Sequence, residues 1–182
     1  MQGTEIRPVM PLDLGVAGAV VRSWRRGDEE SLVRHANNRK VWINLRDRFP
    51  HPYTPADAER WIAFATSQQP ETNFAIAVGE EAVGGVGLDL KTDVERRSAE
   101  VGIWLGEAYW GKGIATAAAR AMTEYAFASF DLCRLYCSVF AWNGASMRIL
   151  EKAGFACEAL LKKAATKDGK TIDVYLYAMI KR

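Results

Sequence analysis

The chain has 182 residues, of which 49% are hydrophobic and 25% charged, and these values suit one well-packed globular domain rather than a disordered chain. Lysine and arginine number 24 and aspartate and glutamate 22, so the net charge of +2 does not indicate a nucleic-acid binder. No run approaches the roughly 18 apolar residues of a membrane span, and the charged, proline-containing first residues do not resemble a signal peptide.

The three cysteines, Cys133, Cys137 and Cys157, form no CxxC pair, and neither His35 nor His51 has a cysteine within a few residues. This spacing does not fit a disulfide framework or a zinc site. Cys137 lies in an alternating apolar stretch, and we interpret it as a small core residue. We therefore expect a cytoplasmic protein with reduced thiols and no bound metal.

The N-terminal part of the chain predicts a tail, a short strand and a helix. Residues 1–16 are expected to form a weakly ordered tail before a single domain that spans 17–182. A strand is expected at 19–24. A helix is expected over 28–38, with Asp28 as its N-cap because aspartate is favoured at that position.

A second helix has a strong start signal. The loop 44–53 is interrupted by prolines and ends at Thr54, Pro55 and Asp57. Threonine followed three residues later by an acidic side chain predicts a capping-box arrangement, and proline favours the first helical position. Apolar residues then recur at helical spacing from Ala58 to Ala65, which predicts a buried helix face.

The rest of the chain predicts a strand meander and then alternating helices and strands. Within 98–105 the apolar residues alternate, and Glu100 and Trp104 share the opposite face. This order predicts an α/β domain of the α+β type, with a mixed, mostly antiparallel central sheet flanked by helices rather than a doubly wound fold. The expected strands lie at 74–78, 82–90, 98–105, 134–140, 155–162 and 170–180, and the expected helices at 114–126 and 144–153.

The chemistry is expected at the loop Trp110–Thr116, which follows a strand and opens an alanine-rich helix. Gly111 and Gly113 let the backbone turn sharply and approach a ligand, and the N–H groups of the first helical turn favour an anion. Lys112 and Thr116 add an ammonium group and a hydroxyl group. The two glycines alone are equally consistent with a loop that binds no ligand.

Two common phosphate-binding motifs do not fit this loop. Read from Gly106, the loop resembles a Walker A motif, but Gly113 stands where that motif has its magnesium-binding serine or threonine. The dinucleotide fingerprint fails because Thr116 replaces its third glycine. A metal-free cradle of backbone amides for a diphosphate remains, and a nucleotide phosphate binder is kept as an alternative.

Longer stretches carry a family resemblance. Trp110–Ala115 resembles the Q/R-x-x-G-x-G/A motif of the GNAT N-acetyltransferase superfamily, with tryptophan in the first position. The resemblance implies a single GNAT domain that uses acetyl-CoA as co-substrate, needs no metal and acetylates a primary amine. Stretches similar to the RimJ/RimL-type branch, in family order, are Phe49–Ile62, Ala99–Gly106, Tyr109–Thr116, Asn143–Phe155 and Asp168–Ile180.

The resemblance also implies where acetyl-CoA binds. The strand before the glycine loop would part from its neighbour and bind the pantetheine arm through its main chain, while the glycine loop would hold the diphosphate. Asn143 resembles an asparagine beside the thioester, and it fits equally well as the N-cap of the next helix. The implied cofactor-binding residues are Ile103, Trp104, Leu105, Trp110, Gly111, Lys112, Gly113, Ile114, Ala115, Thr116, Asn143 and Ser146.

A few side chains are candidates for the proton transfers. Glu100 is the candidate general base, directly or through water, because alternation places it opposite the apolar face of its strand; a solvated surface carboxylate is the alternative. Ser146 resembles a hydroxyl that this branch places near the departing sulfur, which implies a general acid. Tyr175 and Tyr177 are alternative acids or packing residues. Cys137 is not expected to act as a nucleophile, because transfer in the family is direct.

The acceptor is expected to be an α-amine, such as a protein N-terminus. An amine with a pKa near 7.8 is about 14% neutral at pH 7, whereas a lysine side chain near 10.4 is only about 0.04% neutral. Small amines such as an aminoglycoside or a polyamine are alternatives, as is an inactive acyl-CoA sensor. A monomer or homodimer is expected, with no direct binding to nucleic acid or membranes.

Overall fold

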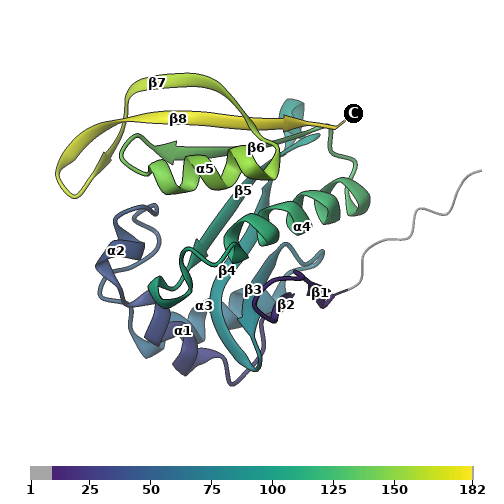
Figure 1. The fold of residues 1–182 in the computed structure, drawn as a ribbon, viewed down its shortest axis with the longest axis vertical. Helices are drawn as coiled ribbons and strands as arrows, with labels where there is room; N and C mark the ends of the chain where they lie inside the picture. Colours follow the sequence, from purple (N-terminus) through teal and green to yellow (C-terminus); the bar gives the residue numbers. More distant parts are fainter. Residues whose placement is uncertain (1–9, 182) are drawn as a thin grey trace, which may run out of the picture.

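The computed structural model describes residues 10–181, and nothing is described for 1–9 and 182. Eight strands form one sheet in the order β1-β2-β3-β4-β5-β6-β8-β7 (Figure 1). Neighbouring strands are antiparallel except β5 and β6, which are parallel. The strands are β1 (Leu12–Asp13), β2 (Ala19–Ser23), β3 (Asn73–Val78), β4 (Glu81–Leu90), β5 (Ser98–Leu105), β6 (Arg134–Phe140), β7 (Ala156–Lys167) and β8 (Lys170–Ile180). The predicted α/β fold with a mixed, mostly antiparallel sheet is confirmed.

Helices cover both faces of the sheet. The α-helices are α1 (Glu29–Ala36), α2 (Arg39–Trp42), α3 (Pro55–Ser67), α4 (Ile114–Ser129) and α5 (Gly144–Ala153), and short 3-10 turns η1 (Asp93–Glu95) and η2 (Glu107–Tyr109) flank β5. Alternate residues of β3 face opposite ways, since Phe74 and Ile76 join the core under α4 and α5 while Ala75 joins the core under α1 and α3. Within the part of the chain that is described, no helix is long and apolar enough to cross a membrane.

The segment 10–16 belongs to the edge of the sheet. The weakly ordered tail expected over residues 1–16 is therefore wrong for this segment, and residues 1–9 lie outside the described part of the chain. β1 pairs antiparallel with β2. Every second residue of the segment is apolar and packs, partly buried, against the main core: Met10, Leu12, Leu14 and Val16. This short alternation is the sequence signal for the extra strand.

The helix expected over 28–38 is divided in two by the structure. α1 ends at Ala36, and Asn38 caps α2 by accepting a bond from the Lys40 N–H at 2.8 Å. Asp28 stands at the N-cap position of α1, but its side chain caps nothing. Both of its oxygens instead accept from the Arg22 guanidinium at 2.8 Å, because a buried carboxylate is better compensated by a charged partner.

Candidate active site

The sheet opens between its two parallel strands. β5 and β6 pair at Ser98–Arg134, Ala99–Leu135 and Glu100–Tyr136, and the pairing ends there. β5 nevertheless continues to Leu105, where it is still paired with β4. Beyond Glu100, therefore, the edge of β5 that faces β6 has no strand partner among residues 10–181, and its main-chain groups can pair with an extended ligand. The strand separation that the family resemblance implies is present.

The glycine loop lies between β5 and α4, where both glycines adopt a left-handed backbone conformation. The φ angle is 75° at Gly111 and 82° at Gly113. Gly113 is the N-cap of α4, and no side chain caps the helix. A Cβ placed on Gly111 would meet nothing within 4 Å. A Cβ on Gly113 would lie 3.7 Å from a Val16 methyl carbon, so the open space is beside Gly111. An uncapped helix start next to this open turn is what a diphosphate site requires, and the residues present fit the CoA diphosphate.

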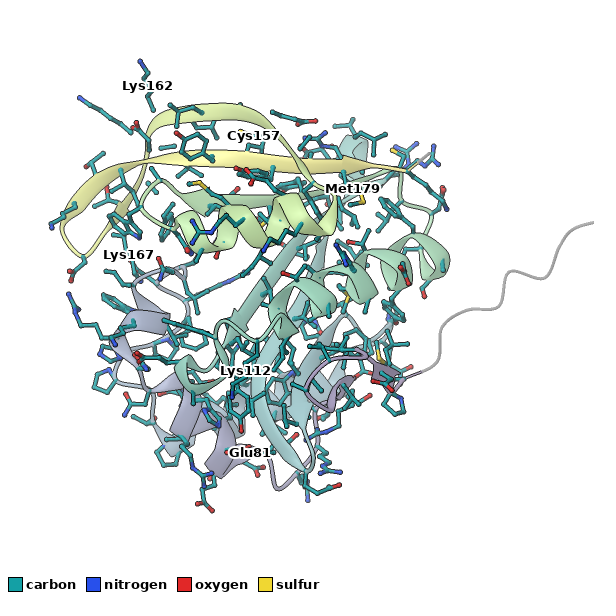
Figure 2. The ribbon with its side chains drawn as sticks, in the orientation of Figure 1. Glu81, Lys112, Cys157, Lys162, Lys167 and Met179 are labelled. Carbon is teal, nitrogen blue, oxygen red and sulfur yellow. The ribbon has the colours of Figure 1, made fainter. Side chains whose placement is uncertain are left out.

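Side chains before the glycines hold this loop in place. The Trp110 indole Nε1–H donates to the Leu105 carbonyl at 2.7 Å, so this tryptophan closes the turn. The Tyr109 hydroxyl donates to Glu81 Oε2 at 3.2 Å, and His35 Nε2 lies 2.9 Å from Glu81 Oε1. The hydrogen bond from His35 is the main cause that lowers the pKa of Glu81. Glu81 and Lys112 both lie in the lower half of Figure 2. Sequence reasoning missed His35 and Glu81, which are 46 residues apart.

Asn143 and Ser146 form a reciprocal pair at the start of α5. The Ser146 N–H donates to Asn143 Oδ1 at 3.1 Å, so Asn143 does cap the helix. Asn143 Nδ2 in turn donates to Ser146 Oγ at 2.8 Å. Because that bond occupies an acceptor site of the hydroxyl, the hydroxyl proton is left to donate elsewhere. The helix-capping role and a role at the thioester are thus compatible for Asn143.

Glu100 lies where β5 and β6 part, on the face opposite the helices α4 and α5. The side chain is only 12% exposed, and its Oε1 accepts from the Arg46 guanidinium. Its Oε2 is 3.7 Å from Lys91 Nζ. The carboxylate is therefore neither solvated nor isolated, and sequence reasoning missed both cations. Arg46 lies 54 residues from Glu100 in a loop without periodicity, so only tertiary structure reveals the pair.

The remaining candidates differ in their surroundings. Tyr175 lies in β8 opposite Val139 and is partly buried against the main core. Tyr177 is buried, and its hydroxyl donates to Glu151 Oε1 at 2.9 Å; burial is the main cause that raises its pKa to about 12. Cys137 packs against the core as predicted, and burial raises the pKa of its thiol to about 12.

The loop between α2 and α3 reaches across the opening to the other half of the sheet. Trp142 Nε1–H donates to Asn44 Oδ1 at 3.1 Å. At the end of the β7–β8 hairpin, the buried Lys167 Nζ lies 2.7 Å from Asp47 Oδ1 and 3.6 Å from the centre of the Trp42 ring. Figure 2 shows Lys167 at this hairpin end, beside the α2 region. These contacts close one side of the opening between β5 and β6.

No three His, Cys, Asp or Glu side chains of residues 10–181 come together as metal ligands would. The described groups that surround the opening are instead main-chain amides, hydroxyls, and carboxylates that are paired with cations. Such a set suits a co-substrate with a diphosphate and an extended arm, held beside a group that can accept a proton.

Residues 19–156 match the acetyltransferase (GNAT) domain family, and the chain belongs to that family. It is 36% identical to the uncharacterized N-acetyltransferase p20 of Bacillus licheniformis over 60% of this chain and 62% of that one. It is 37% identical to spermidine N(1)-acetyltransferase of Escherichia coli over 51% of this chain and 50% of that one. The chain thus matches about half to two thirds of the length of such relatives.

A solved structure shows the same fold. RimL, described as a ribosomal L7/L12 α-N-protein acetyltransferase in complex with coenzyme A, superposes with a TM-score of 0.78. The superposition covers 90% of this chain and 94% of that one at 20% sequence identity. At this identity the likeness establishes the fold alone.

Proposed function

We propose that this protein transfers the acetyl group of acetyl-CoA to a primary amine, and that the acceptor is an α-amine such as a protein N-terminus. The observation that carries the proposal is the opening between β5 and β6 beside the left-handed Gly111–Gly113 turn. An unpaired strand edge next to an uncapped helix start suits an extended arm that ends in a diphosphate. Bound acetyl-CoA supplies an activated thioester.

The two faces of the sheet would receive different substrates. The glycine loop and Ser146 belong to α4 and α5, which pack on the same face and share one core. Glu100 points to the other face, as does Trp104, which packs with the second core. A donor bound along α4 and an acceptor from the side of Glu100 would meet in the opening. Main-chain groups of Ile103 and Leu105 would hold the arm between them. Those of Trp104 face β4, as the bond from the Gly106 N–H to the Val83 carbonyl two residues further on indicates.

The proton transfers are assigned to groups on either side of the opening. The acceptor nitrogen attacks the thioester carbonyl, an N–C bond forms and the C–S bond breaks. Glu100 would take the proton from the amine, directly or through a water molecule. Ser146 would give its hydroxyl proton to the departing sulfur, with its Oγ held by Asn143. Tyr175 is the alternative acid, because it lies partly exposed opposite Val139 on β6.

The names of the relatives leave three kinds of acceptor open. An L-amino acid N-acetyltransferase of Escherichia coli is 26% identical over 84% of this chain and 99% of that one. One relative is a spermidine acetyltransferase, and another, in Escherichia coli, is a ribosomal-protein-serine acetyltransferase that is 30% identical over 59% of this chain. The fraction of neutral amine at pH 7 favours the α-amine as acceptor. About 14% of an α-amine is neutral and therefore reactive at this pH without help from a base. A small amine is the second candidate.

Ligand-dependent thermal unfolding tests the binding part of this proposal. Acetyl-CoA and CoA should each raise the Tm without added metal, and ATP with magnesium should not. Gly113→Val should weaken acetyl-CoA binding at least tenfold, about 1.4 kcal/mol, because valine resists the left-handed φ that the turn before α4 requires. Gly79→Val is the matched control, since Gly79 also has a positive φ but lies in the β3–β4 turn.

Three results would count against the binding site. The first is an unchanged CoA affinity in a folded Gly113→Val variant. The second is a strict magnesium requirement, which would favour a nucleotide phosphate binder. The third is an equal loss of affinity in Gly79→Val, which would attribute the effect to general destabilisation rather than to the cradle.

A further inference from the structure

The carboxylate of Glu100 is surrounded by cations. Arg46 donates to one oxygen, and Lys91 Nζ lies 3.7 Å from the other. Lys91 also lies 5.7 Å from the ring centre of Tyr136, the residue that pairs with Glu100 across the two strands. We call Arg46, Lys91 and Glu100 the acceptor cluster. Lys91 also lies 2.7 Å from Asp89, so the two cations are balanced by two carboxylates.

Several other acidic side chains of the surrounding elements already have cationic partners. Asp47 pairs with Lys167, and Asp168 pairs with Arg39. On the sheet beyond the acceptor cluster, Asp89 pairs with Lys91 at 2.7 Å and Glu158 pairs with Arg134. A polyamine would have to displace one of these partners for each of these carboxylates that it binds.

The guanidinium of Arg46, by contrast, is accessible. Its side chain is 53% exposed, whereas that of Glu100 is 12% exposed. The backbone beneath it is held in place, because the next residue, Asp47, bonds to the buried Lys167. A fixed, half-exposed guanidinium suits a planar carboxylate, which it can bind through two parallel hydrogen bonds. Because the position is fixed before binding, less entropy is lost when a ligand carboxylate arrives.

Resting on the proposed acetyl transfer, we propose that the acceptor carries a carboxylate close to its reactive amine, and that Arg46 binds this carboxylate. Such acceptors are amino acids with a free amine or peptides with an acidic residue next to a free N-terminus. When the acceptor carboxylate binds Arg46, it takes the place of Glu100 on the guanidinium. Glu100 is then released to accept a proton from the amine.

Competition between matched acceptors tests the assignment. The panel is a short peptide with a free N-terminus and glutamate as its second residue, the same peptide with glutamine there, free glutamate, and spermidine. We expect the kcat/KM of the glutamate peptide to exceed that of the glutamine peptide at least tenfold. Arg46→Gln should abolish this ratio. Arg48→Gln, an exposed arginine in the same loop, should preserve it as the matched control.

Acceptor affinity gives a second readout that does not depend on turnover. Binding of each panel member to the complex of the protein with CoA is measured by titration calorimetry, and the same order is expected. A preference for spermidine, or an acidic preference that survives Arg46→Gln in a variant with native Tm, would overturn the inference. Free glutamate and the glutamate peptide distinguish an amino-acid acceptor from a peptide acceptor. Absence of acetylation with every amine, while binding remains selective, would instead refute the proposed acetyl transfer alone.

Discussion

The Tyr109 hydroxyl donates to Glu81 Oε2 at 3.2 Å and so ties the turn before the glycine loop to the start of β4. The rings of His35 and Tyr109 also meet edge to face, with centres 5.5 Å apart. His35 comes from α1, so one small cluster joins the first helix, the sheet and the loop. We infer that this cluster sets the direction in which the Gly111 and Gly113 amides point.

Removal of the Tyr109 hydroxyl should therefore affect the co-substrate more than the chemistry. Tyr109→Phe should raise the KM for acetyl-CoA roughly fivefold, equivalent to a hydrogen bond of about 1 kcal/mol, and leave kcat nearly unchanged. Glu81→Gln should act in the same direction. Glu80→Gln is the control, because the neighbouring carboxylate pairs with Arg25 at the surface. A loss confined to kcat would show that the cluster does not position the loop.

Ser146→Ala should lower kcat at least tenfold and change the KM for acetyl-CoA less, because a general acid acts in the transition state. Asn143→Asp is an informative companion variant. It keeps the oxygen that caps α5 but removes the donor to Ser146 Oγ, so kcat should fall while the Tm stays close to that of the wild type. If the loss in Ser146→Ala lies wholly in KM, the serine is a binding or helix-start residue and Tyr175 becomes the candidate acid.

The pH profile of Glu100→Gln tests the general base. With an α-amine acceptor, the variant should lose much of its kcat/KM near about pH 6.5 and far less near about pH 9, where the amine arrives neutral. Steady-state rates across this range with the wild type and the variant provide the comparison. A loss that is independent of pH would instead make Glu100 a positioning residue for Arg46.

Cys137 should be unreactive although it lies near the acceptor cluster. Burial, and secondarily the Glu100 carboxylate, raise the pKa of its thiol to about 12. Because the thiolate is the reactive form, little of it is present at pH 8 in the folded protein. Iodoacetamide should therefore label the exposed Cys157 rapidly and Cys137 only after unfolding, as measured by peptide mass spectrometry. Rapid labelling of Cys137 in the folded protein would contradict this account.

Local signals in the sequence predict the helices well where the signal is complete within a few residues. Thr54 and Asp57 form the expected capping box, with both reciprocal bonds present, and α3 begins at Pro55 as predicted. α2, with only four residues, has no periodicity to detect and was missed. Asp28 shows the opposite failure: its residue type and position predict an N-cap, but Arg22, six residues earlier in the chain, binds its carboxylate instead.

The candidate site divides in the same way. The glycine loop and the Asn143–Ser146 pair are contiguous in sequence, and their positions could be predicted from motifs. The partners of Glu100 could not be predicted in this way, because Arg46 comes from a loop and Lys91 from beyond the end of another strand. The contact of Lys167 with Asp47 joins residues 120 positions apart. Long-range ion pairs carry no sequence period, so only the fold reveals them.

Mass spectrometry of the acetylated product, with the released CoA thiol counted in the same reaction, tests the proposed acetyl transfer most directly. Purified protein and acetyl-CoA are incubated without added metal, with a peptide that has a free N-terminus or with its N-terminally blocked, lysine-containing counterpart. We expect acetylation of the free α-amine and one thiol released for each acetyl group transferred. Equal rates on the blocked peptide would contradict the α-amine assignment, and tight acetyl-CoA binding with no transfer to any amine would contradict the proposed acetyltransferase activity.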